Sequence, residues 1–282
     1  MAKGFAVTWL GVLLLPASGS AAVMVGSPLT DAHSGVVSTG ADAVYVNTAL
    51  PGAAFPSGSP VNGTVIRWRL RGVSPSGMTN TFTFRVLRPA GGGMFTGAGT
   101  SAPQTLFNGF DDLTRTFDTS LPIHVGDQIG LGATNGAGTP TSGVAGDSFE
   151  NFTDFADGGP SGSPLATFPN SEVLFNADVE PTNAFSLSAS QPNKKRGTAT
   201  LTATLPNRGM LQVQGALVNP QTLTASQGAH TLTLVPTKAT GKRLRKKGKA
   251  SGQVDFTFAP DFGTTSAQSL AVPLKLKRKK KH

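Results

Sequence analysis

The 282-residue sequence contains no cysteine and only three glutamates, and its one long apolar run lies close to its start. Without cysteine there can be no disulfide scaffold, cysteine-ligated zinc, iron–sulfur cluster or thiol nucleophile. The shortage of glutamate and of helical periodicity argues against a helical bundle or coiled coil. The 35 glycines and 20 prolines are too few for a collagen-like or disordered chain, so the sequence predicts a turn-rich β protein.

Residues suited to catalysis are scarce. The four histidines have no metal-ligand spacing among them; they are His33, His124, His230 and His282. No nucleophile elbow, phosphate loop or dinucleotide fingerprint is present. A pair of carboxylates that cleaves glycosides is compatible with the sequence, because the separation of about 5–10 Å between such carboxylates is a property of the tertiary structure. We therefore expect no catalytic residue and no cofactor, and a protein that is not an enzyme.

The first 22 residues have the pattern of a signal peptide. Lys3 precedes an apolar run over residues 5–15, Pro16 follows it, and small residues end at Ala22, after which we expect cleavage. The run is shorter than the roughly twenty residues of a membrane span, with an uncleaved anchor as the alternative. We expect a secreted or cell-envelope protein without a transmembrane span after signal cleavage. Export without cysteine suits a bacterial protein.

Residues 23–180 are predicted to form a β-sandwich of jelly-roll type. Polar and apolar residues alternate in 64–71 and 79–87, a Gly126-Asp127 turn divides 121–132, and 171–179 has the pattern of a last strand. Glycine-rich residues 91–93 and 132–146 are expected loops. Several strands over about 150 residues without a helical period favour this all-β architecture.

Residues 181–184 are the expected linker to a second β domain, residues 185–276, which a basic tail over 277–282 follows. In residues 198–205 small and apolar side chains alternate with threonines, as expected of a half-buried strand. Similar short patterns recur to residue 276. Six or seven strands in about 100 residues predict an immunoglobulin-like sandwich.

Two parts of the chain resemble modules of uncharacterised secreted proteins of actinobacterial type. Residues 193–201 (NKKRGTATL), 240–250 (TGKRLRKKGKA) and the lysine-rich end are similar to their C-terminal immunoglobulin-like domain. Residues 85–93 (RVLRPAGGG), 121–122 and 126–131 (GDQIGL) are similar to an N-terminal β-sandwich module of the same proteins. The resemblance implies location and architecture, and it implies no catalytic residue.

The formal net charge of +9 divides unevenly between the two predicted domains. It is −7 over residues 23–183 and +15 over residues 184–282. Dense positive charge attracts polyanions by counterion release, and we expect binding by Lys242, Arg243, Arg245, Lys246, Lys247, Lys249, Lys277, Arg278, Lys279, Lys280 and Lys281. No aromatic residue is interleaved for base stacking, so the expected partner is an anionic cell-envelope polymer or glycan and no specific nucleic acid. Alternatively, these are solvated charges on a loop and a frayed tail that prevent strand-edge aggregation.

Arg67, Arg69 and Arg71 form a second basic feature on one predicted strand face. Guanidinium groups in a row can clamp carboxylates or contact sugars. This surface would suit a carbohydrate-binding module or divergent glycan hydrolase, which is the alternative function. The other interpretation is a strand whose arginines pair with acids on neighbouring strands.

A weaker metal candidate is the acidic segment with Asp147, Glu150, Asp154 and Asp157, which alternates with phenylalanines and is predicted as a loop. Carboxylate oxygens in a flexible loop suit calcium. Alternatively, the phenylalanines close one end of the sandwich and the acids stay in water. The oligomeric state remains open, as does docking of the two oppositely charged domains on each other.

Overall fold

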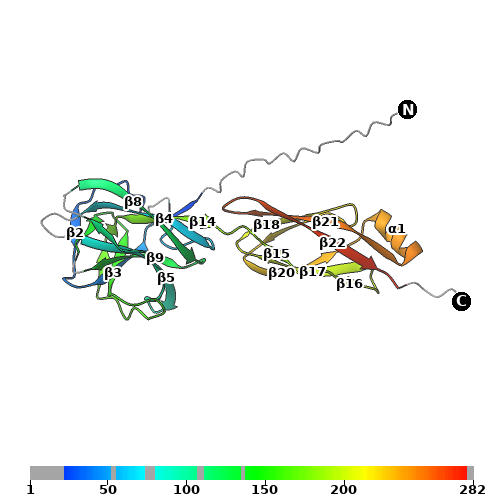
Figure 1. The fold of residues 1–282 in the computed structure, drawn as a ribbon, viewed down its shortest axis with the longest axis horizontal. Coiled ribbons are helices and arrows are strands. Elements are labelled where there is room, and N and C mark those ends of the chain that lie inside the picture. Colours follow the sequence, from blue (N-terminus) through cyan, green and yellow to red (C-terminus); the bar gives the residue numbers. More distant parts are fainter. Residues whose placement is uncertain (1–21, 52–54, 74–79, 107–110, 135–136, 278–282) are drawn as a thin grey trace, which may run out of the picture.

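The computed structural model describes residues 22–51, 55–73, 80–106, 111–134 and 137–277. Two all-β units follow each other along the chain and lie end to end (Figure 1). The expected signal segment up to residue 21 and the tail residues 278–282 lie outside the described residues. Within the described part, strands β1 to β14 pair only with one another, as do strands β15 to β22.

The first domain contains two main antiparallel sheets. One has, in spatial order, β1 (Val23–Gly26), β14 (Phe175–Pro181), β4 (Gly63–Val73) and β8 (Asp111–Ile123). The other has β12 (Ala166–Pro169), β11 (Ser148–Thr153), β3 (Ala43–Ala49), β9 (Gln128–Thr134), β5 (Asn80–Gly91) and β6 (Met94–Thr100), with β7 (Gln104–Leu106) also on β5. A small third sheet joins β13 (Glu172–Val173), β10 (Thr139–Ser142) and β2 (Gly35–Val37).

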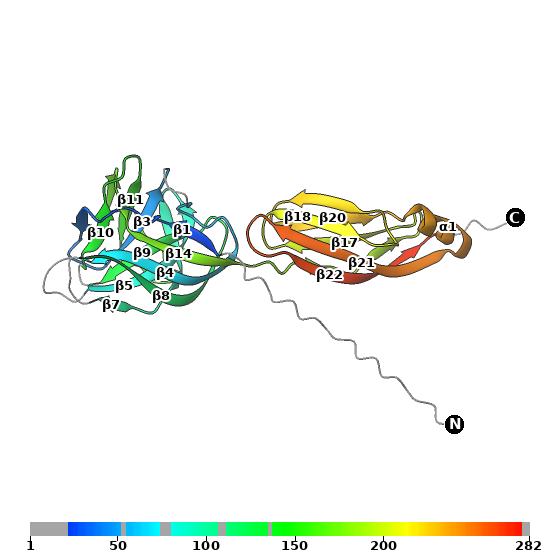
Figure 2. The ribbon, with the colours of Figure 1, turned by 90° about the horizontal axis from the view of Figure 1, so that it is seen from above.

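The path of the chain between the two main sheets is that of a jelly roll. Strands β1, β4, β8 and β14 make one sheet, whereas β3, β9, β5 and β6 are consecutive neighbours in the other, and the chain crosses repeatedly between the two sheets. Eight strands wound in this way form two Greek keys. Strands β10 to β13 are an insertion before the last strand. Of these, β11 lies beside β3 (Figure 2), and β11 and β12 extend the larger sheet.

The core of the first domain lies between these sheets around Trp68. Its ring is fully buried and lies 4.5 Å from the Phe117 ring and 6.0 Å from the Phe84 ring, centroid to centroid. Truncating such a side chain typically costs about 3–5 kcal/mol. The larger sheet also has a smaller apolar cluster, which includes Phe95, Phe152 and Phe155. Phe149 belongs to the main core, so all three phenylalanines of the acidic segment are core residues.

The second domain is a sandwich of two antiparallel sheets. One consists of β15 (Ser186–Leu187), β16 (Gln191–Asn193), β17 (Thr198–Leu205) and β20 (Gly228–Leu234). The other consists of β19 (Gln221–Ala225), β18 (Gly209–Gln214), β21 (Lys249–Pro260) and β22 (Ser266–Lys275). Buried leucines and phenylalanines from both sheets form one core. Strand number, pairing and crossovers are those of an immunoglobulin-like sandwich.

The basic run 242–249 is not a loop: Lys249 begins β21, and residues 242–247 lie in the helix α1 (Lys238–Lys247). The Thr237 side chain accepts a hydrogen bond from the Thr240 amide at its start, and Gly248 ends it in a left-handed conformation. These are ordinary helix-ending devices, and lysine, arginine and leucine are good helix formers. The basic residues of the last turn also complement the helix dipole.

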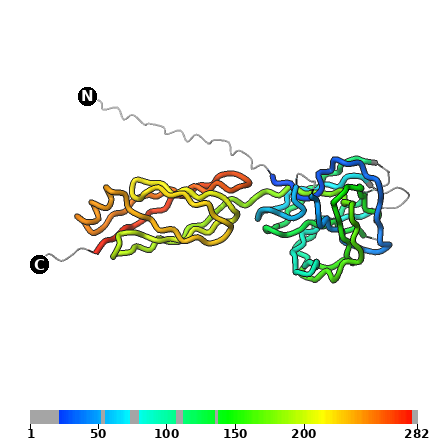
Figure 3. The backbone as a smooth tube through the Cα atoms, turned by 180° about the vertical axis from the view of Figure 1, so that it is seen from behind, coloured from blue at the N-terminus to red at the C-terminus, as the bar shows by residue number. Residues whose placement is uncertain are grey.

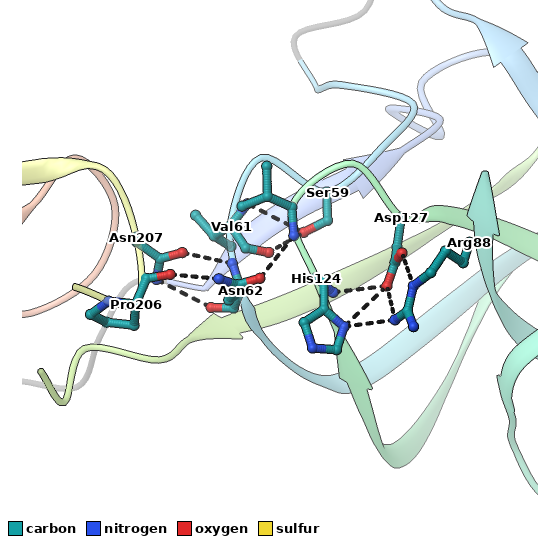
Figure 4. Close-up of polar contacts among 9 residues, drawn as sticks. Ser59, Val61, Asn62, Arg88, His124, Asp127, Pro206 and Asn207 are labelled. Atoms are coloured by element: carbon teal, nitrogen blue, oxygen red, sulfur yellow. Dashed lines mark hydrogen bonds and ion pairs between the residues drawn. The ribbon is translucent and has the colours of Figure 1, made fainter. Parts of the chain in front are cut away.

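A reciprocal pair of asparagines joins the two domains (Figure 4). The Asn62 amide donates to Asn207 Oδ1 at 2.7 Å, and Asn207 Nδ2 donates to the carbonyls of Thr182 (2.7 Å) and Asn62 (3.2 Å). The Asn62 side chain donates in turn to the Pro206 carbonyl. Asn207 is 2% exposed. The domains therefore meet through neutral hydrogen bonds, and α1 lies at the far end of the second domain (Figures 1 and 3).

Candidate polyanion-binding groove

One buried residue, Leu244, determines which face of helix α1 packs on the domain and therefore which basic side chains are directed towards β21. Leu244 is 1% exposed and packs into the core of the second domain, and Thr240 is also buried. At about 100° per residue, Arg243 and Lys247 then lie on the flank of the helix that faces β21. The Arg243 guanidinium donates to the Ser251 carbonyl of β21 at 3.2 Å.

A groove of about 430 Å³ lies between this flank and the β21–β22 pair. Four cationic side chains line it, from Arg243, Lys247, Lys249 and Lys275. Its remaining lining comes from Ala250, Ser251, Pro273 and Leu274. The cations come from three different elements, and the register places Lys249 opposite Lys275 in neighbouring strands.

A second hollow of about 400 Å³ adjoins the first and shares Lys247, Lys249 and Lys275 with it. Lys194 and Lys277 add two more cations. The Lys277 amide donates to the Lys194 carbonyl at 2.7 Å, which fixes the chain beyond β22 against the turn after β16. We refer to both hollows together as the basic groove, lined by Lys194, Arg243, Lys247, Lys249, Lys275 and Lys277.

The basic groove is far from the only two acids of its domain, Asp255 and Asp261. Asp255 accepts a hydrogen bond from Ser269 and lies six residues along β21 from Lys249, about 20 Å. Asp261 pairs with Arg208 at 3.1 Å and lines a hollow at the domain joint. In the described part of the chain, none of the six groove cations has an ion-pair partner. Its positive charge is therefore uncompensated.

The structure divides the predicted polyanion-binding set. Arg243, Lys247, Lys249 and Lys277 line the groove, whereas Lys242, Arg245 and Lys246 are exposed on other faces of α1. Arg278, Lys279, Lys280 and Lys281 lie outside the described residues. Sequence reasoning did not include Lys194 in the set. The Lys194-Lys195-Arg196 run was the available signal for Lys194.

The arginine row on β4 is occupied by contacts within the protein. Arg69 makes two 2.7 Å hydrogen bonds to the Asp178 carboxylate of β14, and Arg67 adds one at 2.8 Å. Burial alone would raise the pKa of Asp178, but the hydrogen bonds and charges of both arginines outweigh it and lower that pKa. Arg71 donates to the Leu29 carbonyl at 2.5 Å. This arrangement matches the pairing interpretation of the row.

The four acids of the expected calcium loop do not converge, because residues 148–153 form strand β11. Asp154 and Asp157 lie 2.8 and 3.5 Å from the Arg85 guanidinium. Glu150 accepts from Thr167, while Asp147 precedes the other end of the strand. Among the residues that the structure describes, no three His, Asp or Glu side chains are grouped as metal ligands.

Two histidines stabilise the first domain locally. His33 Nδ1 lies 2.6 Å from Asp112, whose pKa this hydrogen bond lowers. At the predicted Gly126-Asp127 turn, Asp127 accepts from the His124 amide at 2.9 Å and from Arg88 (Figure 4). The Asp127 carboxylate thus ties the β8–β9 turn to β5, and His124 belongs to a turn-stabilising cluster.

Fold and groove together define a two-domain all-β protein with a strongly basic distal surface. No protein-family model matches the chain, and no curated protein is detectably similar to it. Across the described ranges, helix α1 is too short and too polar to cross a membrane, and no other helix could do so.

Proposed function

We propose that this protein is an exported, non-catalytic binding protein that holds an anionic cell-envelope polymer in the basic groove. The observation that carries the proposal is the convergence of six cations from separate elements around one open groove without a nearby acid. A solvated charge run requires no such convergence. Five of the six are lysines, whose compact ammonium groups suit phosphate as point charges.

The position of the groove supports a tethering role. Helix α1, which forms one side of the groove, lies at the end of the second domain away from the first domain (Figure 1). A polymer bound there would leave the surface of the jelly roll accessible. Because the first domain carries net negative charge, an anionic polymer would also be repelled from it and directed towards the basic end.

The test is a titration of the purified chain with long-chain inorganic polyphosphate over a series of salt concentrations. The groove variant combines Lys249→Gln, Lys275→Gln and Lys277→Gln. A matched control combines Lys242→Gln, Arg245→Gln and Lys246→Gln. It removes the same amount of positive charge from faces of α1 outside the groove. We expect a steep loss of affinity with salt in the wild type, and a slope reduced by roughly two to three in the groove variant.

The control variant should keep most of the affinity. Equal losses in both triple variants would show that net charge alone attracts the polymer. Binding that does not weaken with salt would contradict the electrostatic mechanism itself. A pull-down with isolated cell walls would then relate the soluble probe to an envelope polymer.

The alternative, a carbohydrate-binding module or glycan hydrolase on the first domain, has less support. Two of the three arginines that would contact a glycan, Arg67 and Arg69, are already bound to Asp178, and Arg71 is bound to the Leu29 carbonyl. Glycan-array binding by the wild type that is lost in Arg69→Ala, with the first domain of the variant still folded, would favour that alternative over ours.

A further inference from the structure

A buried carboxylate without a partner lies in the small third sheet of the first domain. Glu172 starts β13, pairs with Ser142 of β10 and is 1% exposed. Neither of its two carboxylate oxygens has a hydrogen-bond partner among the described residues. Native proteins rarely leave a buried charged group unsatisfied, and each exception requires a reason.

A second buried carboxylate, that of Asp147, belongs to the segment that lies against Ser171 and Glu172. Asp147 is 4% exposed, and its Oδ1 also lacks a partner in the described part of the chain. The Ser171 amide, next to Glu172, donates to the Asp147 carbonyl at 3.3 Å, so the two segments lie against each other. Asp31 is exposed but near enough to act on both carboxyl groups electrostatically.

The charges around Glu172 are all of one sign. Burial raises the pKa of its carboxyl to about 7, and the Asp147 and Asp31 charges raise it further, whereas the Ser27 hydroxyl, which is close but outside hydrogen-bond geometry, lowers it. No positively charged side chain is among the causes of this pKa shift. Two buried carboxylates that act on each other without a counter-charge are costly, and a bound cation would remove that cost.

We propose that Glu172 and Asp147 form a cation site that takes calcium. Three partnerless carboxylate oxygens from two buried side chains provide hard oxygen ligands, which calcium prefers. Backbone carbonyls and water complete its coordination, since calcium accepts six to eight oxygens in variable geometry. Exposed Asp31 draws the ion towards the buried pair. This site differs from the expected loop, with which it shares only Asp147.

The test begins with direct binding. The full chain is stripped with a chelator, dialysed against calcium, and analysed for bound metal and by calorimetric titration. We expect one calcium per chain and a rise in the thermal midpoint of roughly 5 °C at a hundredfold excess over Kd. Magnesium should give a smaller rise, because it demands octahedral geometry and loses its water reluctantly.

Two isosteric variants locate the site. Glu172→Gln should abolish the calcium-dependent rise and should raise the midpoint in chelator, because it removes the buried charge. Glu150→Gln, on the neighbouring strand and in the expected loop, should behave as the wild type. No calcium bound to the wild type, or an unchanged rise in folded Glu172→Gln, would overturn the proposal. Polyphosphate binding at the basic groove is a separate readout and is unaffected by either result.

Discussion

Lys249 and Lys275 lie directly opposite each other in the antiparallel pair β21–β22, and both line the two hollows of the basic groove. Side chains at such positions have Cβ atoms about 4.5–5.5 Å apart, and like charges there destabilise the sheet. The groove is therefore maintained against local repulsion. An anion between the two ammonium groups would relieve that repulsion, so stability and binding should respond in opposite directions.

Lys275→Gln should raise the free energy of unfolding at low salt by about 0.5 kcal/mol. The same change should weaken polyphosphate binding several-fold, because one groove cation is lost. Urea unfolding at low and high salt measures the first effect, which should shrink as salt screens the repulsion. Lys242→Gln on α1 is the control and should change neither quantity appreciably. A destabilised Lys275→Gln would show that the two lysines do not repel.

The sequence predicted the β architecture because alternation of apolar and polar residues follows directly from the alternating side-chain directions of a strand. In β17 each small or apolar residue from Ala199 to Leu205 is buried, and each threonine is more exposed, as expected. Jelly-roll and immunoglobulin-like sandwiches were accordingly predicted, and the strand order agrees with both. The helix was not predicted, since a run of basic residues with one leucine has little apolar periodicity and its caps are single residues.

The groove was only partly predictable for a different reason. Local charge density identified the basic residues of α1, but the meeting of Lys194, Lys249 and Lys275 depends on the β21–β22 register and on the chain after β16. Similarly, Glu172 appears in sequence as an ordinary surface acid. Its burial arises from the pairing of β13 with β10. Both strands are short and polar, so the sequence pattern does not predict this pairing.

Asp178→Asn should destabilise the first domain by about 2 kcal/mol at neutral pH. It removes the carboxylate that Arg67 and Arg69 share; the magnitude is reduced because Arg67 is 42% exposed. Because the folded-state pKa of Asp178 is lowered, its contribution is present above the ordinary carboxyl pKa near 4 and is lost as pH falls through the folded value.

Chemical unfolding of wild type and Asp178→Asn between pH 7 and pH 3 measures that dependence. The difference between the two proteins should be constant down to about pH 5 and then shrink. A difference that grows on acidification would contradict the assigned pairing. Arg67→Gln should give a smaller loss than Arg69→Gln, since Arg69 is less exposed and bonds both carboxylate oxygens.

Asn207→Ala should loosen the joint between the domains. The variant loses one acceptor and two donor contacts at a buried position, at a cost of about 1–3 kcal/mol. Small-angle scattering should show a broader range of inter-domain orientations, while circular dichroism stays unchanged. Asn207→Asp, which keeps the acceptor for the Asn62 amide, should be intermediate. An unchanged scattering profile would show that other contacts determine the end-to-end arrangement.

Gly248 and Gly241 offer a test of whether the groove acts by its shape or by charge alone. Gly248 has φ of 74° where α1 turns into β21, between the groove residues Lys247 and Lys249. An alanine there should cost about 1 kcal/mol and disturb both flanking lysines. Gly241 lies inside α1, where an added Cβ meets only Arg245, at 3.9 Å. Gly241→Ala should therefore stabilise the helix by about 0.5–1 kcal/mol.

Neither alanine changes net charge, so polyphosphate titrations of the two variants isolate geometry. We expect Gly248→Ala to bind more weakly than the wild type and Gly241→Ala to bind at least as well. Urea unfolding of each variant confirms the opposite effects on stability and shows that both remain folded during the titration. If both variants bound polyphosphate equally, a groove shaped by the α1–β21 turn would be unnecessary, because dense charge at this end of the domain would then suffice for binding.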